Sequence, residues 1–192
     1  ILHKLNLENQ EVLISPQKLP PESLVHIYSA ADCTINIADA EGFGLATFES
    51  LACETPIITT MTGGLQEQVT YVEKISEDIM LKRNSKVKPV KEYEHGIGIE
   101  PSSKAIIGSQ DVPYIYEDRL SGDRVVDALM MMYEFGAEKR EELGKAGREH
   151  VLKNYNFDDF AKQWEKIMLD TYEKCGSWDT RKNYKSWELQ AV

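Results

Sequence analysis

The stretch that decides the fold reads Glu41-Gly42-Phe43-Gly44-Leu45-Ala46-Thr47-Phe48-Glu49-Ser50-Leu51-Ala52-Cys53-Glu54-Thr55-Pro56. Two glycines open it, and a helical pattern from about residue 45 to residue 53 follows them. A short apolar run stands on either side, at residues 33–38 and at residues 55–60. Strand, glycine-bearing loop, helix and second strand in this order are typical of a parallel α/β unit.

The same alternation extends toward the N-terminus. Residues 11–15 form another short apolar run, which predicts a strand, and Pro20-Pro21-Glu22 is suited to the first turn of a helix. These runs lack the period-2 polarity of half-exposed strands, so we expect a parallel sheet that is covered on both faces. The predicted fold class is α/β, with a Rossmann-like doubly wound parallel sheet and extra C-terminal helices. In the helix that opens at Pro20-Pro21-Glu22, the side chains expected to face the core are Leu24, Ile27, Tyr28 and Ala31.

Beyond residue 70 the pattern changes. Residues 95–101 predict a short strand that ends at a turn, and residues 112–116 predict an added edge strand, where proline is tolerated. From residue 121 onward the spacing predicts three helices. A basic run spans residues 82–91 and is interpreted as a solvated insertion. Phe160, Trp164, Met168 and Tyr172 recur at intervals of four in the last helix, which indicates core packing.

Composition excludes several classes of protein. The chain has 192 residues, of which 42% are hydrophobic and 28% charged, with a formal net charge of −10. This balance argues against a disordered chain and against electrostatic binding to nucleic acid. No apolar run approaches the roughly 20 residues that a transmembrane helix needs. Three cysteines and four histidines show no metal-ligand spacing, so we expect no metal site and a cytoplasmic, reduced compartment.

The glycine-bearing loop suits an anionic ligand. Gly42 and Gly44 allow the backbone to approach a ligand closely, and amide groups in the first turn of the following helix favour phosphate. Glu41 precedes this anion site and is suited to hydroxyl groups or to a centre that becomes positive. Glu49 lies about one turn inside the helix, roughly 6–8 Å further on, where a carboxylate can accept hydrogen bonds from a vicinal diol. A sugar, a diphosphate and a ribose, in that order, fit this loop.

With these residues the chain resembles the C-terminal, donor-binding domain of retaining GT-B glycosyltransferases, the glycosyl transferases group 1 that include family 4. Their signature has two glutamates separated by seven residues, as Glu41 and Glu49 are. The resemblance runs from about residue 12 to residue 172. Flanking features that agree are Tyr28, Ala31-Asp32, Leu51-Ala52, Thr55-Pro56, Gly63-Gly64, Glu67, Gly96, Pro101, Leu143-Gly144, Gly147-Arg148 and Tyr155-Asn156-Phe157.

The resemblance implies a role for each residue of the motif. Glu41 would bind a hydroxyl of the donor sugar near the anomeric carbon and act as the catalytic residue. Glu49 would bind the ribose hydroxyls, and backbone amides at residues 43–45 would hold the sugar and diphosphate. Transfer would proceed with retention, without a required metal and with no cofactor beyond the nucleoside-diphosphate-sugar substrate. The implied donor-binding set is Glu41, Gly42, Phe43, Gly44, Leu45 and Glu49.

The resemblance also implies a division of the chain. A donor-binding domain would span residues 1–175, with insertions at 71–94 and 104–119, and a tail would span 176–192. In the family an acceptor domain and the basic residues that clamp the diphosphate precede this region. We therefore expect the C-terminal half of an enzyme about twice as long, inactive alone, whose glycan, lipid or protein acceptor is bound mainly by the other half.

Some residues depart from the family pattern, and some alternatives stay open. Glu54 stands where glycine is usual, Ala38 where serine is common and Gln17 where glycine is frequent. A non-catalytic nucleotide-sugar-binding subunit and a GT-B-fold sugar-nucleotide epimerase are the alternative functions. Peripheral contact with a membrane is an alternative to a purely cytoplasmic location. The simplest competing interpretation of residues 41–49 is a loop and helix with two solvated carboxylates.

Overall fold

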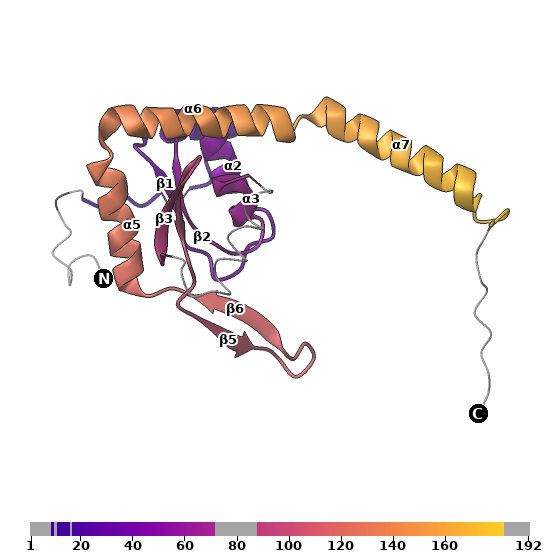
Figure 1. The fold of residues 1–192 in the computed structure, drawn as a ribbon, viewed down its shortest axis with the longest axis horizontal. Helices are drawn as coiled ribbons and strands as arrows, with labels where there is room; N and C mark the ends of the chain where they lie inside the picture. The colour runs from indigo at the N-terminus through magenta and orange to yellow at the C-terminus, as the bar shows by residue number, and fades with distance from the viewer. Residues whose placement is uncertain (1–8, 10, 16, 72–87, 183–192) are drawn as a thin grey trace. The chain divides into compact units, whose positions relative to one another are not determined.

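A computed structural model describes residues 9, 11–15, 17–71 and 88–182 of the chain (Figure 1). They form two compact units, residues 1–147 and residues 148–192, which are described separately. The first unit contains the sheet and the candidate site. Its elements and those that follow are α1 (Pro21–Ala30), β1 (Thr34–Asn36), α2 (Leu45–Ala52), β2 (Ile57–Thr60), α3 (Leu65–Val69), β3 (Val90–Tyr93), β4 (Gly96–Ile99), β5 (Ser103–Ile107), β6 (Ile115–Arg119), α5 (Gly122–Glu134), α6 (Gly136–Asn154) and α7 (Phe157–Cys175).

The main sheet has four strands in the order β1-β2-β4-β3. Strands β1, β2 and β4 are parallel, with Ile58 opposite both Ile35 and Ile97. Every residue of β2 and β4 is buried, which explains why these runs are apolar or small throughout instead of alternating. Strand β3 joins β4 antiparallel in a tight hairpin, so the sheet has one antiparallel edge.

Helices cover both faces of the sheet, as Figure 1 shows with α5 on one side and α2 and α3 on the other. Ala128 and Met132 of α5 pack on a buried cluster that includes Ile58, Ile97 and Ile99. Burying apolar side chains of this size contributes roughly 1.5–3 kcal/mol each, so this layer contributes substantially to stability. The predicted α/β class with a doubly wound parallel sheet is confirmed.

The parallel strands position the functional region. The connections that leave β1, β2 and β4 all emerge at the carboxyl ends of these strands, which is where open α/β sheets bind ligands. The β1–α2 connection contains the two glycines of the motif, and the β2–α3 connection contains Gly63 and Gly64. The connection after β4 leads into β5 and β6, which form a separate two-stranded antiparallel sheet.

Three predictions from the sequence are wrong, two of them on strands and one on the buried face of a helix. Residues 11–15 form no strand, and residues 115–119 pair with residues 103–107 instead of joining the edge of the main sheet. Helix α1 has no buried residue, and Ile27 is 51% exposed, because α1 lies on α2 without a further layer among the described residues.

The predicted helices after residue 121 are confirmed as α5, α6 and α7, but the apolar stripe of α7 is not core. No residue of α7 is buried, and Trp164 is 50% exposed. A spacing of four reports that one face of a helix is apolar and does not report whether a partner covers that face. Part of the predicted insertion at residues 71–94 and most of the basic run fall at residues 72–87, outside the described residues. The predicted domain boundaries remain predictions.

Candidate functional site

The β1–α2 loop reaches helix α2 through a residue with a left-handed backbone. Gly44 is the N-cap of α2 and has φ +88°. A Cβ at this position would lie 2.4 Å from Leu65 Cδ2 and 2.8 Å from Thr47 Oγ1. Both the backbone conformation and the packing therefore require glycine at the start of α2.

Gly42 occupies a different environment two residues earlier. A Cβ added there would meet no atom within 4 Å, and its φ is not in the left-handed region. Neither packing nor backbone conformation in the described chain explains a glycine at this position. Open space beside a glycine on a ligand-binding edge of the sheet is what a close backbone approach to a ligand needs.

A buried glutamine of α3 holds the loop in place. The Gln68 side chain is fully buried, and its Nε2 donates hydrogen bonds to the carbonyl oxygens of Phe43 and Gly44, at 2.5 and 3.2 Å. The Thr47 hydroxyl contacts the Gln68 amide oxygen and lies 2.8 Å from the Gly44 carbonyl oxygen. Because buried amides need partners, these bonds fix the loop and the amide together. Sequence reasoning missed Gln68, since nothing in its local pattern marks it as buried.

The β2–α3 connection packs backbone to backbone against the same loop. Gly63 has φ +46°, and a Cβ there would lie 1.8 Å from the Glu41 carbonyl oxygen. A Cβ on Gly64 would lie 2.5 Å from the Gly42 carbonyl oxygen, and the Gly64 amide donates to the Glu41 carbonyl at 3.3 Å. The paired glycines are therefore required so that the two loops can meet.

The two glutamates of the motif lie in different surroundings. Glu41 is half-buried beside Gly63, whereas Glu49 is exposed on α2 and accepts a hydrogen bond of 3.1 Å from the Tyr28 hydroxyl. Burial and the neighbouring Glu49 carboxylate raise the pKa of Tyr28, so this hydroxyl stays a donor. Glu49 also borders a cavity of about 230 Å³ between α1 and α2. Its lining residues are Pro21, Leu24, Val25, Tyr28, Glu49, Ala52 and Cys53.

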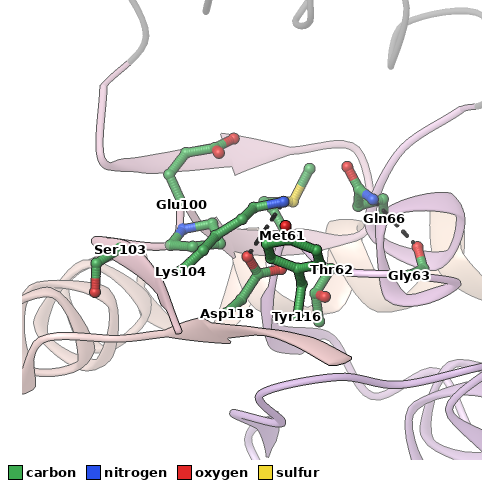
Figure 2. A pocket seen from close by; sticks show the side chains of 10 residues that line it. Met61, Thr62, Gly63, Gln66, Glu100, Ser103, Lys104, Tyr116 and Asp118 are labelled. Atoms are coloured by element: carbon green, nitrogen blue, oxygen red, sulfur yellow. Dashed lines mark hydrogen bonds and ion pairs between the residues drawn. The ribbon is translucent and has the colours of Figure 1, made fainter. Parts of the chain in front are cut away.

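A larger pocket of about 540 Å³ opens at the carboxyl ends of β2 and β4 (Figure 2). Gly63, which packs against Glu41, is one of its walls, so this pocket adjoins the loop that carries the motif. The β5–β6 hairpin forms another wall, and sequence reasoning assigned no role to it. The lining residues are Met61, Thr62, Gly63, Gln66, Glu100, Pro101, Ser103, Lys104, Tyr116 and Asp118.

Within the described ranges, no group of three or more histidine, cysteine, aspartate or glutamate residues could hold a metal ion. The described helices also include none that is long and apolar enough to cross a membrane. The expected independence from metal stays a prediction.

Comparison with known proteins relates the N-terminal part of the chain to one family. Residues 1–75 match the family model described as glycosyl transferases group 1. A D-inositol 3-phosphate glycosyltransferase of Acidothermus cellulolyticus is 41% identical over 59 residues, which are 31% of this chain and 13% of that protein. The corresponding protein of Corynebacterium jeikeium is 50% identical over 46 residues, or 24% of this chain and 11% of that protein. The matched segments thus span only a small part of these relatives.

Two solved structures share the fold. A sucrose-phosphate synthase from Thermosynechococcus elongatus superposes with a TM-score of 0.57 and 21% identity over 90% of this chain and 33% of that one. The C-terminal domain of a glycosyl transferase group 1 family protein from Francisella tularensis does so with a TM-score of 0.50 and 19% identity, over 80% of this chain and 58% of that one. Residues 1–75 therefore resemble the glycosyl transferases group 1, and the chain shares the GT-B fold of these solved structures.

Proposed function

We propose that this chain is the donor-binding half of a retaining glycosyltransferase, which moves a sugar from a nucleoside-diphosphate sugar to an acceptor hydroxyl. One observation carries the proposal. The loop at the carboxyl end of β1 combines an open glycine at Gly42, a helix start at Gly44 and glutamates on either side. Packing explains Gly44, Gly63 and Gly64, and the open space beside Gly42 leaves room for a ligand close to the backbone.

The diphosphate would lie at the start of α2. Amide groups of the first turn of α2 and the helix dipole favour negative charge there. Glu49 would accept hydrogen bonds from the ribose hydroxyls, and the hydroxyl of Tyr28 would keep the Glu49 carboxylate oriented. The mostly apolar cavity beside Glu49 offers a place for the flat base. The donor-binding set expected from the sequence is retained in this proposal.

Glu41 would act at the reacting centre. Its backbone is fixed by the Gly64 amide and by the close contact with Gly63, so its position depends little on the ligand. In the proposed reaction the bond between the anomeric carbon and the diphosphate oxygen breaks, and its electron pair goes to the diphosphate. The acceptor oxygen bonds to the same face of that carbon, and its proton passes to the departing phosphate oxygen. Glu41 would hold the sugar and stabilise the positive charge that develops on the anomeric carbon.

The curated relatives add one test acceptor. The names of these relatives include D-inositol 3-phosphate, a phosphorylated cyclic polyol, so this compound belongs in an acceptor panel beside simple glycosides. Neither the subunit nor the epimerase alternative gains support from a described contact, and product analysis separates both from glycosyl transfer.

Calorimetry of the native-length protein against UDP, GDP and ADP tests the donor site. We expect one of these nucleotides to bind wild type and to bind Glu49→Ala at least about tenfold more weakly, because the ribose contacts are lost. Glu149→Ala removes an exposed carboxylate of α6 and serves as the matched control. Equal affinity of all three proteins, or no binding by wild type, would contradict the proposal.

A further inference from the structure

We infer that the pocket between the carboxyl ends of β2 and β4 and the β5–β6 hairpin binds a neutral, hydroxyl-rich ligand, the polyol part of the acceptor. This inference rests on the proposed function, because it assigns the pocket to the acceptor of that reaction. It also places part of the acceptor on this domain, whereas the sequence led us to expect acceptor contacts mainly elsewhere.

The position of the pocket supports an acceptor role. Gly63 is part of its wall and also contacts the Glu41 carbonyl oxygen, so the pocket lies directly beside the loop proposed to hold the donor sugar. Glu49 and the apolar cavity proposed for the base do not line it. A volume of about 540 Å³ falls within the range of roughly 300–1,000 Å³ typical of small-molecule sites.

The charges of the lining select the kind of ligand. Among the residues that the structure describes, the lining includes the ammonium group of Lys104 and the carboxylates of Glu100 and Asp118. This balance disfavours a second phosphate, and the Lys104 ammonium disfavours a cation. A ligand that both donates and accepts hydrogen bonds suits a lining that offers both an ammonium group and carboxylates. Sugar and polyol hydroxyls do both.

One carboxylate oxygen of the pocket has an ion-pair partner but no hydrogen-bond partner among the described residues. Asp118 Oδ1 is buried, and Lys104 Nζ forms an ion pair with it at 3.7 Å, beyond hydrogen-bond distance. Figure 2 shows Lys104 extending from β5 toward Met61, with a dashed line to Asp118, while Tyr116 of β6 presents its ring to the same space. Lys104 is 69% exposed and can move aside, so a ligand hydroxyl could donate to Asp118 and accept from Lys104.

The hairpin is joined to the loop of the proposed donor site. The Asp118 amide donates to the Asp39 carbonyl at 2.9 Å, and Arg119 forms an ion pair with the Asp39 carboxylate. Asp39 lies two residues before Glu41. These contacts thus join the hairpin wall of the pocket to the loop that carries Glu41, the residue proposed to act on the donor sugar.

Saturation-transfer NMR on the native-length protein tests this inference. The probes are methyl α-glucopyranoside, methyl α-mannopyranoside and myo-inositol, each with the nucleotide that binds wild type. We expect at least one probe to bind wild type and to bind Lys104→Met and Asp118→Asn about tenfold or more weakly, since each variant removes a hydroxyl partner. The affinity for the nucleotide, measured by calorimetry, should stay unchanged. Lys145→Met, an exposed lysine of α6 outside the pocket, is the control and should behave as wild type.

Several outcomes overturn the inference. These are no polyol binding by wild type, polyol binding that both pocket variants retain, or a loss of nucleotide affinity in both variants. Inorganic pyrophosphate that competes with the polyol and loses affinity in Lys104→Met would show an anion site instead. A wild-type protein that binds none of the nucleotides contradicts the proposed function itself, which separates that failure from a failure of the pocket assignment.

Discussion

The β1–α2 loop and the β5–β6 hairpin border the same end of the sheet, yet they are built on different principles. The loop is fixed by backbone contacts, with Gly63 and Gly64 against it and the buried Gln68 amide below it. The hairpin is joined to the loop by one backbone hydrogen bond and by the Arg119–Asp39 ion pair. Buried backbone contacts tolerate little change, whereas exposed ion pairs contribute little stability. The loop is thus held by more buried contacts than the hairpin, which fits the proposed assignment of the donor to the loop and of the acceptor to the hairpin pocket.

The largest effect is expected from the reacting centre of the loop. Glu41→Ala should lower turnover by about 10²–10³-fold, because the proposed contact stabilises charge that develops only in the transition state. Donor affinity should fall far less. Steady-state kinetics combined with nucleotide calorimetry checks this prediction, and unchanged turnover would remove Glu41 from the mechanism.

The two glycines of the loop should separate stability from binding. Gly44→Ala should lower the free energy of unfolding by about 2–4 kcal/mol, because the added Cβ meets Leu65 in a left-handed backbone. Gly42→Ala should change stability by less than about 0.5 kcal/mol, since its Cβ enters open space. Gly42→Ala should therefore keep its stability and bind the donor nucleotide more weakly, whereas Gly44→Ala should be clearly destabilised. Denaturant unfolding and calorimetry measure both effects, and equal destabilisation by the two variants would contradict the described loop.

A smaller effect is expected when the hairpin is released from the loop. Arg119→Gln removes the ion pair with Asp39 and should cost about 0.5–1 kcal/mol at most, because Arg119 is partly exposed. Amide hydrogen exchange should become faster in β5 and β6 and stay unchanged in α2. Faster exchange throughout both regions would show that the hairpin and the loop are one rigid element.

An effect of similar size, but of opposite sign, concerns the other end of α2. Glu54 follows the C-cap of α2 with φ +62°, a conformation that favours glycine. Glu54→Gly should therefore stabilise the protein by about 0.5–1 kcal/mol, measured as a rise in the unfolding midpoint. A lower midpoint would indicate that contacts of the Glu54 side chain outweigh its backbone strain.

The sequence predicted the loop far better than the hairpin, for physical reasons. Buried parallel strands need continuous apolar runs and turn glycines, so residues 33–60 indicated their own structure. The partner of a strand depends on the whole chain, and residues 112–116 could equally have joined the main sheet. The hydrogen bonds of Gln68 and the gathering of Lys104 with Asp118 likewise arise from tertiary packing, which leaves no local pattern. Glu41 and Glu49 could be selected as candidate site residues because they flank a loop whose structure was itself predictable from the sequence.

Calorimetric titration of the preferred nucleotide into Gly42→Ala and Lys104→Met, beside wild type, decides where the donor binds. In the proposed mechanism the donor binds on the β1–α2 loop and does not enter the hairpin pocket. We therefore expect a clear loss of nucleotide affinity in Gly42→Ala and wild-type affinity in Lys104→Met. Wild-type affinity in Gly42→Ala together with a loss in Lys104→Met would contradict it and assign the nucleotide to the pocket of the hairpin.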